Sequence, residues 1–168
     1  MSRYRPPQTR SSPYITPEGF SRLQREETEI WKKRAEVTQA LSAAAAEGDR
    51  SENAEYIYRK KQLREIDRRI RYLQKRLPDL NVVDQVGSAD RIFFGAWVTL
   101  EKEDGTEVEY RIVGGDEIAA DSSKGYISVD SPMARALLKK QVDDEVVVTI
   151  GSTKTHYFVS KIRYNTED

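Results

Sequence analysis

The sequence predicts an α+β protein in which a long helical hairpin precedes a small domain with a mostly antiparallel sheet and one short helix. Three observations support this prediction. Two long stretches with helical spacing of apolar residues flank a connection that contains Gly48. After residue 81 the apolar residues follow the period of short strands. One capped helical stretch interrupts those strands.

The first helix begins directly after Thr16. This residue is a suitable N-cap, Pro17 suits the first helical position, and Glu18 suits the positive end of the helix dipole. Apolar or aromatic residues then form an imperfect heptad seam at positions 20, 23, 30, 37, 41 and 44. The two missing steps of this seam carry the charged residues Glu27 and Arg34.

The second helix keeps the same spacing without a break until Pro78 ends it. Its seam consists of Leu63, Ile66, Ile70, Leu73 and Leu77. Two helices with facing seams and a short connection form an antiparallel hairpin, which we expect over residues 15–78. The alternative, one continuous helix that dimerises through its heptads, is disfavoured by Gly48 and the Asp-Arg-Ser run after it.

The C-terminal domain is expected over residues 79–168. The segment "RIFFGAWVTLEKEDGTEVEYRIV" predicts two strands joined by the turn "EDGT", and "GYISVD", "EVVVTI" and "HYFVSKIRY" predict three more. Ser131 and Pro132 begin the one short helix. The predicted core consists of Val98, Leu100, Ile112, Val146, Val148, Phe158 and Val159.

Composition limits the possible classes of protein. The chain has no cysteine, which excludes disulfides, thiol nucleophiles and thiolate metal sites. No apolar run reaches the length of a membrane span and no signal-peptide pattern is present, so we expect a cytoplasmic protein without a membrane partner. Residues 1–14 hold three prolines and three arginines without an apolar period, which predicts a disordered tail.

The charges divide unequally along the chain. Residues 1–76 hold 18 Lys and Arg against 11 Asp and Glu, whereas residues 77–168 hold 10 against 17. Such asymmetry indicates different partners for the two halves. A basic half is typical of proteins that bind a nucleic acid or another acidic surface.

Two acids at the hairpin tip, Asp49 and Glu52, stand three residues apart in "EGDRSENAEY". One interpretation is a capping box, in which Asp49 caps the second helix and Glu52 reaches back. The other is a pair of ligands for a hard cation such as Mg²⁺, which prefers oxygen donors. Two carboxylates are too few for a tight site, so a second molecule would have to complete it.

The second helix is unusually basic. Residues 59–76 contain nine Lys and Arg but only two acids. A basic strip outside the apolar seam consists of Lys60, Arg64, Arg68, Arg71 and Lys75, and Arg59 and Lys61 adjoin it. Such a strip is expected to contact phosphates without reading a base sequence. The alternative is an ordinary solvated helix face.

Several segments together resemble the Gre transcript-cleavage factors of bacterial RNA polymerase, most closely their GreB branch. They are "GDRSENAEYIYRKKQLREIDRRIRYL", "FFGAWVTLE", "YRIVGGDEI" and "ISVDSPMARALLKK". The resemblance extends from Ile15 to Tyr164, and the N-terminal extension lies outside it.

This resemblance implies an antiparallel coiled-coil hairpin, an FKBP-like C-terminal domain and a monomer. The C-terminal domain would dock at the secondary channel of RNA polymerase through Asp130, Ser131 and Pro132, whose alternative role is to start a helix. Asp49 and Glu52 would help hold a Mg²⁺ shared with the polymerase active centre, where the 3′ end of backtracked nascent RNA is cleaved. The basic residues would hold that RNA. The chain would therefore not be an enzyme by itself.

Two alternative functions remain open at this point. One is a channel-binding regulator of transcription without cleavage activity, against which the acidic tip argues. The other is a peptidyl-prolyl isomerase, suggested only by the FKBP-like fold, and fold alone is weak evidence of activity. Aromatic residues that would have to line such a pocket are Phe93, Phe94, Trp97, Tyr110, Tyr126 and Phe158.

Overall fold

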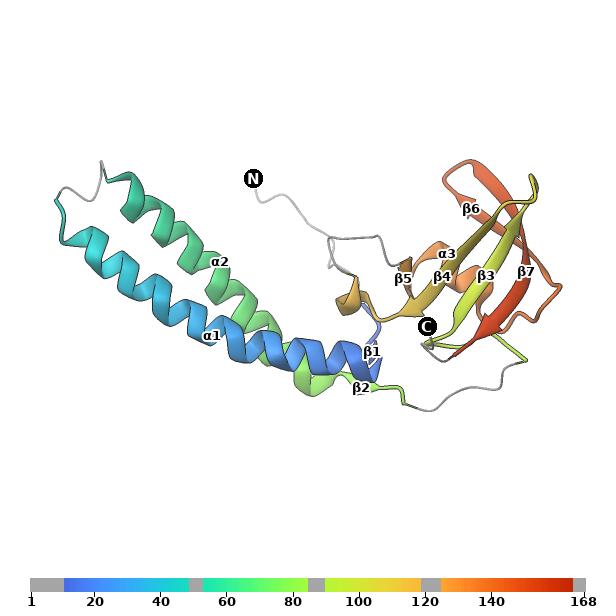
Figure 1. Cartoon of the computed structure of the whole chain (residues 1–168), viewed down its shortest axis with the longest axis horizontal. Coiled ribbons are helices and arrows are strands. Elements are labelled where there is room, and N and C mark those ends of the chain that lie inside the picture. Colours follow the sequence, from blue (N-terminus) through green and yellow to red (C-terminus); the bar gives the residue numbers. More distant parts are fainter. Residues whose placement is uncertain (1–10, 49–52, 85–89, 119–124, 165–168) are drawn as a thin grey trace, which may run out of the picture. The chain divides into compact units, whose positions relative to one another are not determined.

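The computed structural model describes residues 11–48, 53–84, 90–118 and 125–164. It divides into two compact units, which are considered separately (Figure 1). The hairpin unit is Phe20–Leu80, and the globular unit combines Met1–Gly19 with Asn81–Asp168. No helix in the described part of the chain combines the length and the hydropathy that a membrane span requires.

Two long helices run antiparallel in the hairpin unit. They are α1, Pro17–Ala45, and α2, Ala54–Arg76 (Figure 1). Their direction follows from the contacts, since Glu26 pairs with Arg69 whereas Arg34, further along α1, pairs with Asp67. A short 3₁₀ turn, Leu77–Asp79, ends α2 at the predicted proline.

The predicted apolar seam is buried between these helices. Ile66, Ile70 and Leu73 of α2 are at most 6% exposed, and Val37 of α1 packs with the first two. Arg34 occupies one missing step of the α1 seam and pairs with Asp67 across the hairpin at 2.7 Å. Because both side chains are about one-third exposed, water screens this pair and its stabilisation is modest.

A five-stranded sheet forms most of the globular unit, in the order β5-β4-β3-β7-β6. The strands are β3 Trp97–Lys102, β4 Glu107–Val113, β5 Tyr126–Ser128, β6 Glu145–Ile150 and β7 Thr153–Arg163. Among the strand pairs of this described sheet only β4–β5 is parallel, which agrees with the predicted mostly antiparallel sheet.

The turn from β3 to β4 has the predicted turn chemistry. Gly105 adopts a φ of 84°, a conformation that favours glycine. The hydroxyl and the amide of Thr106 both donate to the Asp104 carboxylate, and these hydrogen bonds lower the pKa of that carboxyl below its ordinary value. The turn therefore fixes the register of the hairpin between the two strands.

The core lies on one face of the sheet and includes Ala134 and Leu137 of the short helix α3, Pro132–Leu137. Six of the seven predicted core residues are buried there, but Phe158 is 43% exposed and that prediction is wrong. Its neighbours Tyr157 and Val159 point inward instead. Successive side chains of a strand face opposite sides, so Phe158 and Val159 cannot both enter the core.

The N-terminal segment forms part of the globular unit. Strand β1, Tyr14–Ile15, pairs in parallel with β2, Asn81–Val82. The sequence predicts a disordered tail over residues 1–14, of which residues 1–10 lie outside the described part. Ser12, however, donates to Asp130, and the Pro13 carbonyl accepts from the Asn81 amide at 2.8 Å. The chain thus leaves the globular unit after β1 and re-enters it at β2.

Candidate functional site

The start of α2 is capped by Asn53. Its Oδ1 accepts from the Tyr56 amide at 3.1 Å, and its Nδ2 donates to the Ala44 carbonyl at the end of α1 at 2.8 Å. One amide side chain therefore satisfies free backbone groups on both helices. The interpretation in which Asp49 caps this helix is wrong, because α2 begins only at Ala54.

Asp49 and Glu52 themselves lie outside the described residues. Within the described residues, no three His, Asp or Glu side chains are grouped closely enough to hold a metal ion. The signal for the true cap was present in the sequence, since asparagine is among the strongest N-cap residues and Asn53 directly precedes the helical period.

The basic strip of α2 faces solvent. All five of its members are exposed, as is the adjoining Lys61. None of these six cations forms an ion pair with another described side chain. Lys60 lies over the Tyr56 ring, 5.9 Å from its centre, a contact that orients the ammonium without neutralising it. The members of the strip are Lys60, Arg64, Arg68, Arg71 and Lys75.

Arg59 differs from its neighbours. Its Nε pairs with Glu55 at 2.8 Å, one turn earlier, and its guanidinium also donates to Gln62 at 3.0 Å. The same group lies 5.4 Å from the centre of the Tyr58 ring. Arg59 is half-buried and already has a charged partner, so it is a weaker candidate for a phosphate contact than the strip.

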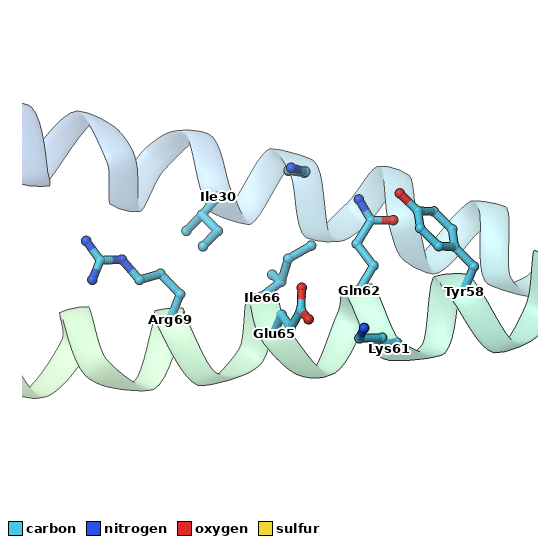
Figure 2. A pocket seen from close by; sticks show the side chains of 8 residues that line it. Ile30, Tyr58, Lys61, Gln62, Glu65, Ile66 and Arg69 are labelled. Carbon is cyan, nitrogen blue, oxygen red and sulfur yellow. The ribbon is translucent and has the colours of Figure 1, made fainter. Parts of the chain in front are cut away.

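An open groove of about 380 Å³ lies between the two helices. Figure 2 shows Ile30 of α1 and Ile66 of α2 pointing toward one another, with Gln62 and Tyr58 beside them. The remaining lining is charged and consists of Lys33, Lys61, Glu65 and Arg69. Because apolar and charged side chains alternate in this open lining, the groove differs from the enclosed apolar pockets that hold small molecules.

Asp130, Ser131 and Pro132 lie at the start of α3. The Ser131 hydroxyl accepts from the Ala134 amide at 3.1 Å, and Pro132 occupies the first turn, so the prediction that Ser131 and Pro132 start a helix is confirmed. The Asp130 carboxylate accepts hydrogen bonds from both the amide and the hydroxyl of Ser12. No pattern in the sequence indicates that contact.

The aromatic residues considered for an isomerase pocket lie on opposite faces of the sheet. Phe94 and Tyr110 pack against the core. Trp97 lies on the other face of the sheet. It stands in a row across four strands that also contains Tyr126, Arg111 and Arg163. The Arg163 guanidinium lies 4.8 Å from the centre of the Trp97 ring. The aromatic side chains therefore form no common pocket in the described part of the globular unit.

Two family models match nearly the whole chain. One, "Transcription elongation factor, N-terminal", matches residues 13–82, and the other, "Transcription elongation factor, GreA/GreB, C-term", matches residues 87–164. This chain belongs to the GreA/GreB family of transcription elongation factors. The Gre models meet near β2, where the chain re-enters the globular unit.

Within the Gre family the chain is GreB-like. It is 56% identical over 166 residues to transcription elongation factor GreB of Pseudomonas aeruginosa, which covers 98% of both chains. It is 56% identical over 167 residues to GreB of Xanthomonas axonopodis pv. citri, again over 98% of both chains. A solved structure of the transcription factor Gfh1 is 24% identical, with 92% of this chain and 99% of its own covered and a TM-score of 0.44. That similarity is too low to add to the assignment.

Proposed function

We propose that this protein binds in the secondary channel of bacterial RNA polymerase and stimulates cleavage of the 3′ end of backtracked nascent RNA, which rescues arrested complexes. It is not an enzyme by itself but completes the cleavage centre of the polymerase. The observation that carries the proposal is the exposed basic strip of α2, which forms no ion pair within the described residues, in a chain of the Gre family.

The basic strip has the properties of a backbone-binding surface for single-stranded RNA. Its five cations repeat every three or four residues, so they follow one side of α2. Side chains without acidic partners attract phosphates more strongly than paired ones, and they contact the backbone without reading bases. The strip begins at Lys60, eight residues after Glu52, and would hold extruded RNA near the tip acids.

Asp49 and Glu52 are the proposed catalytic residues and Mg²⁺ ligands. Carboxylate oxygens are the donors that Mg²⁺ prefers, and two of them leave positions for ligands from the polymerase. The bound ion would activate water and stabilise negative charge during phosphodiester hydrolysis. Since Asn53 provides the cap of α2, helix capping does not require either acid.

The globular unit is the proposed docking domain. We assign it an FKBP-like fold and the hairpin unit a coiled coil, and we expect the protein to act as a monomer. Asp130 is the docking candidate that we favour, because this charged residue is half-exposed beside the start of α3. Ser131 and Pro132 would present it through the rigid first turn of that helix.

A stalled, backtracked elongation complex tests this function. Asp49→Asn and Glu52→Gln keep size and remove charge, so we expect loss of stimulated RNA cleavage, read as RNA length on a gel, while binding to polymerase persists. Glu47→Gln removes an exposed acid nearby and serves as the matched control. Full cleavage by the double variant would refute the tip assignment, and loss of binding together with cleavage would refute the division of roles.

A further inference from the structure

Trp31 of α1 is a large aromatic residue that the proposed chemistry does not use. It is 46% exposed, although tryptophan is on average one of the more buried residue types. Its indole makes no hydrogen bond or ring contact with another residue in the described part of the chain. A single exposed apolar residue is ordinary, so the surroundings of Trp31 decide whether it has a role.

The tyrosines of the hairpin differ from Trp31, because a cation of the same helix lies over each of their rings. The pairs are Lys60 over Tyr56 at 5.9 Å, Arg59 over Tyr58 at 5.4 Å and Arg69 over Tyr72 at 5.2 Å, each measured to the ring centre. These cation–π contacts occupy one face of each tyrosine. Within the described residues no cation covers the Trp31 ring, so its indole is available to a flat partner from outside the protein.

The ion pair between Arg34 and Asp67 marks the side of the hairpin on which Trp31 lies. Trp31 stands three residues before Arg34 on α1, and residues at this spacing are neighbours on one face of a helix. The Arg34 Nε contacts the Asp67 Oδ1 at 2.7 Å across the hairpin. Trp31 and Asp67 therefore lie on the same side of the two helices.

The basic strip adjoins that side. Asp67 stands three residues after Arg64 and four before Arg71, so both cations are its neighbours on the surface of α2. Because Arg34 pairs with Asp67, the negative charge of this acid is partly compensated and repels a phosphate less. The axes of packed helices are about 8–10 Å apart, a distance that a few nucleotides can span from the strip to Trp31.

The groove in Figure 2 lies on the opposite side of the hairpin. Residues 67 and 69 are about 200° apart around α2, at 3.6 residues per turn. Arg69 pairs with Glu26 of α1 and lines this groove. Tyr72 follows Arg69 by three residues and belongs to the groove side, whereas Trp31 belongs to the side of Asp67.

We propose that Trp31 is a stacking platform for an unpaired base of the RNA whose phosphates the basic strip binds. This inference rests on the proposed function, since RNA is the partner. Cations that follow the backbone, combined with an aromatic ring that stacks on bases, are the usual means of binding a single strand without sequence preference. The RNA-binding surface then extends over both helices of the hairpin unit.

Tryptophan fluorescence of the full-length protein tests the stacking contact. The chain has two tryptophans, so Trp97→Phe leaves Trp31 as the reporter and Trp31→Leu leaves Trp97. Titration with a short single-stranded oligoadenylate should quench the fluorescence of Trp97→Phe and leave that of Trp31→Leu unchanged. A chain of ribose phosphates of equal length without bases should bind and leave Trp31 unquenched. The proposal is overturned if oligoadenylate does not bind, or if it saturates the protein without quenching Trp31.

Affinity for oligoadenylate separates stacking from charge. Trp31→Leu keeps an apolar side chain and a good helix former, and it should weaken binding about tenfold, as expected for the loss of one stacked base. The slope of log affinity against log salt should stay the same, because no charge is removed. Trp31→Tyr retains a ring and should weaken binding by about threefold or less.

Tyr72→Leu is the matched control, because it removes another exposed aromatic ring of the hairpin, one that Arg69 already covers. It should weaken binding by less than about twofold, since its covered ring is a poorer platform. Equal weakening by Trp31→Leu and Tyr72→Leu, or a shallower salt slope with Trp31→Leu, would overturn the proposal.

Assays with polymerase distinguish failure of this inference from failure of the proposed function. If the parent protein stimulates no RNA cleavage, the proposed function fails, whereas the quenching titration still decides the role of Trp31. If cleavage is stimulated but Trp31 is not quenched, only the stacking assignment fails. A Trp31→Leu protein that binds RNA like the parent but binds polymerase more weakly would show that Trp31 contacts protein, which also overturns the proposal.

Discussion

Ser12 donates two hydrogen bonds to the carboxylate of Asp130, one from its amide at 2.8 Å and one from its hydroxyl, across 118 residues of sequence. Asp130 directly precedes Ser131, the cap of α3. A residue from the beginning of the chain therefore fixes the carboxylate that we assign to polymerase docking. Ser12 and Asp130 hold one end of the N-terminal segment, and Thr16 and Glu117 hold the other.

A double-mutant cycle measures the Ser12–Asp130 contact. Ser12→Ala removes the hydroxyl donor and should lower the free energy of unfolding by about 1 kcal/mol, because a half-buried hydrogen bond to a charged group is of that order. Asp130→Ala should cost more, since it removes both acceptors. Denaturant unfolding of the single and double variants should give a coupling of at least ~0.5 kcal/mol. Strict additivity would contradict the contact.

Asn53→Ala should destabilise the hairpin by about 1–2 kcal/mol, because it removes both the cap of α2 and the donor to Ala44. Asn53→Asp keeps the capping oxygen but loses that donor, so its loss of stability should be smaller. Urea unfolding followed by helical circular dichroism gives both values. Parent-like stability of Asn53→Ala would mean that the tip is closed by other contacts.

Replacement of Lys60, Arg64 and Arg68 by glutamine should impair action on extensively backtracked RNA more than action on RNA extruded by two or three nucleotides. Three phosphate contacts would be lost, so the slope of log affinity for single-stranded RNA against log salt should become shallower by about 2. The salt series and the two cleavage substrates measure these effects.

The matched control carries the same charge change on the other helix. Arg25, Lys32 and Lys33 of α1 are exposed and can be replaced by glutamine in the same way. We expect their loss to affect long and short extruded RNA equally. If the two triple variants behave alike, net charge of the hairpin and not the basic strip governs RNA binding.

The register of β7 makes a prediction that reverses the expectation from hydrophobicity, by which Phe158 and not Tyr157 would lie in the core. Tyr157→Ala should cost about 3 kcal/mol of folding free energy, because Tyr157 is 9% exposed and packs in the core. Burial also raises the pKa of its hydroxyl above the ordinary value. Phe158→Ala should cost less than about 1 kcal/mol, since that ring is 43% exposed. Guanidinium unfolding compares the two variants.

Local patterns predicted most of the secondary structure. Sequence spacing was sufficient where a feature depends on residues within a few positions of one another. Such features are the seam of α2, the cap at Ser131 and the turn at Gly105. The prediction that Asp49 caps α2 was wrong. Two possible N-caps, Asp49 in a capping box and Asn53 alone, lie within four residues of one another, and sequence spacing does not decide between them. The prediction that Phe158 lies in the core was wrong because hydrophobicity alone does not set which side chains of a strand face inward.

Contacts between distant segments were not predictable in this way. Glu117 follows a Gly-Gly turn, and the sequence near it does not indicate its burial, because the amide and the hydroxyl that donate to it from Thr16 lie 101 residues earlier. The predicted domain boundary was affected in the same way, because the strand that joins the N-terminal segment to the globular unit pairs with residues far along the chain. Sequence period places the domain boundary near residue 78, whereas β1 joins the segment before the hairpin to the globular unit. A fragment of residues 79–168 would lack that strand and leave Glu117 without two of its donors.

The pairing of β1 with β2 also orders events during synthesis of the chain. The contacts of the hairpin unit join residues 20–80, so this unit is complete once those residues have left the ribosome. The globular unit needs Tyr14 and Thr16 together with β7, which ends at Arg163, and therefore closes only after Arg163 has left the ribosome. Until then β1 can pair with β2, which directly follows the hairpin, but the five-stranded sheet is still incomplete.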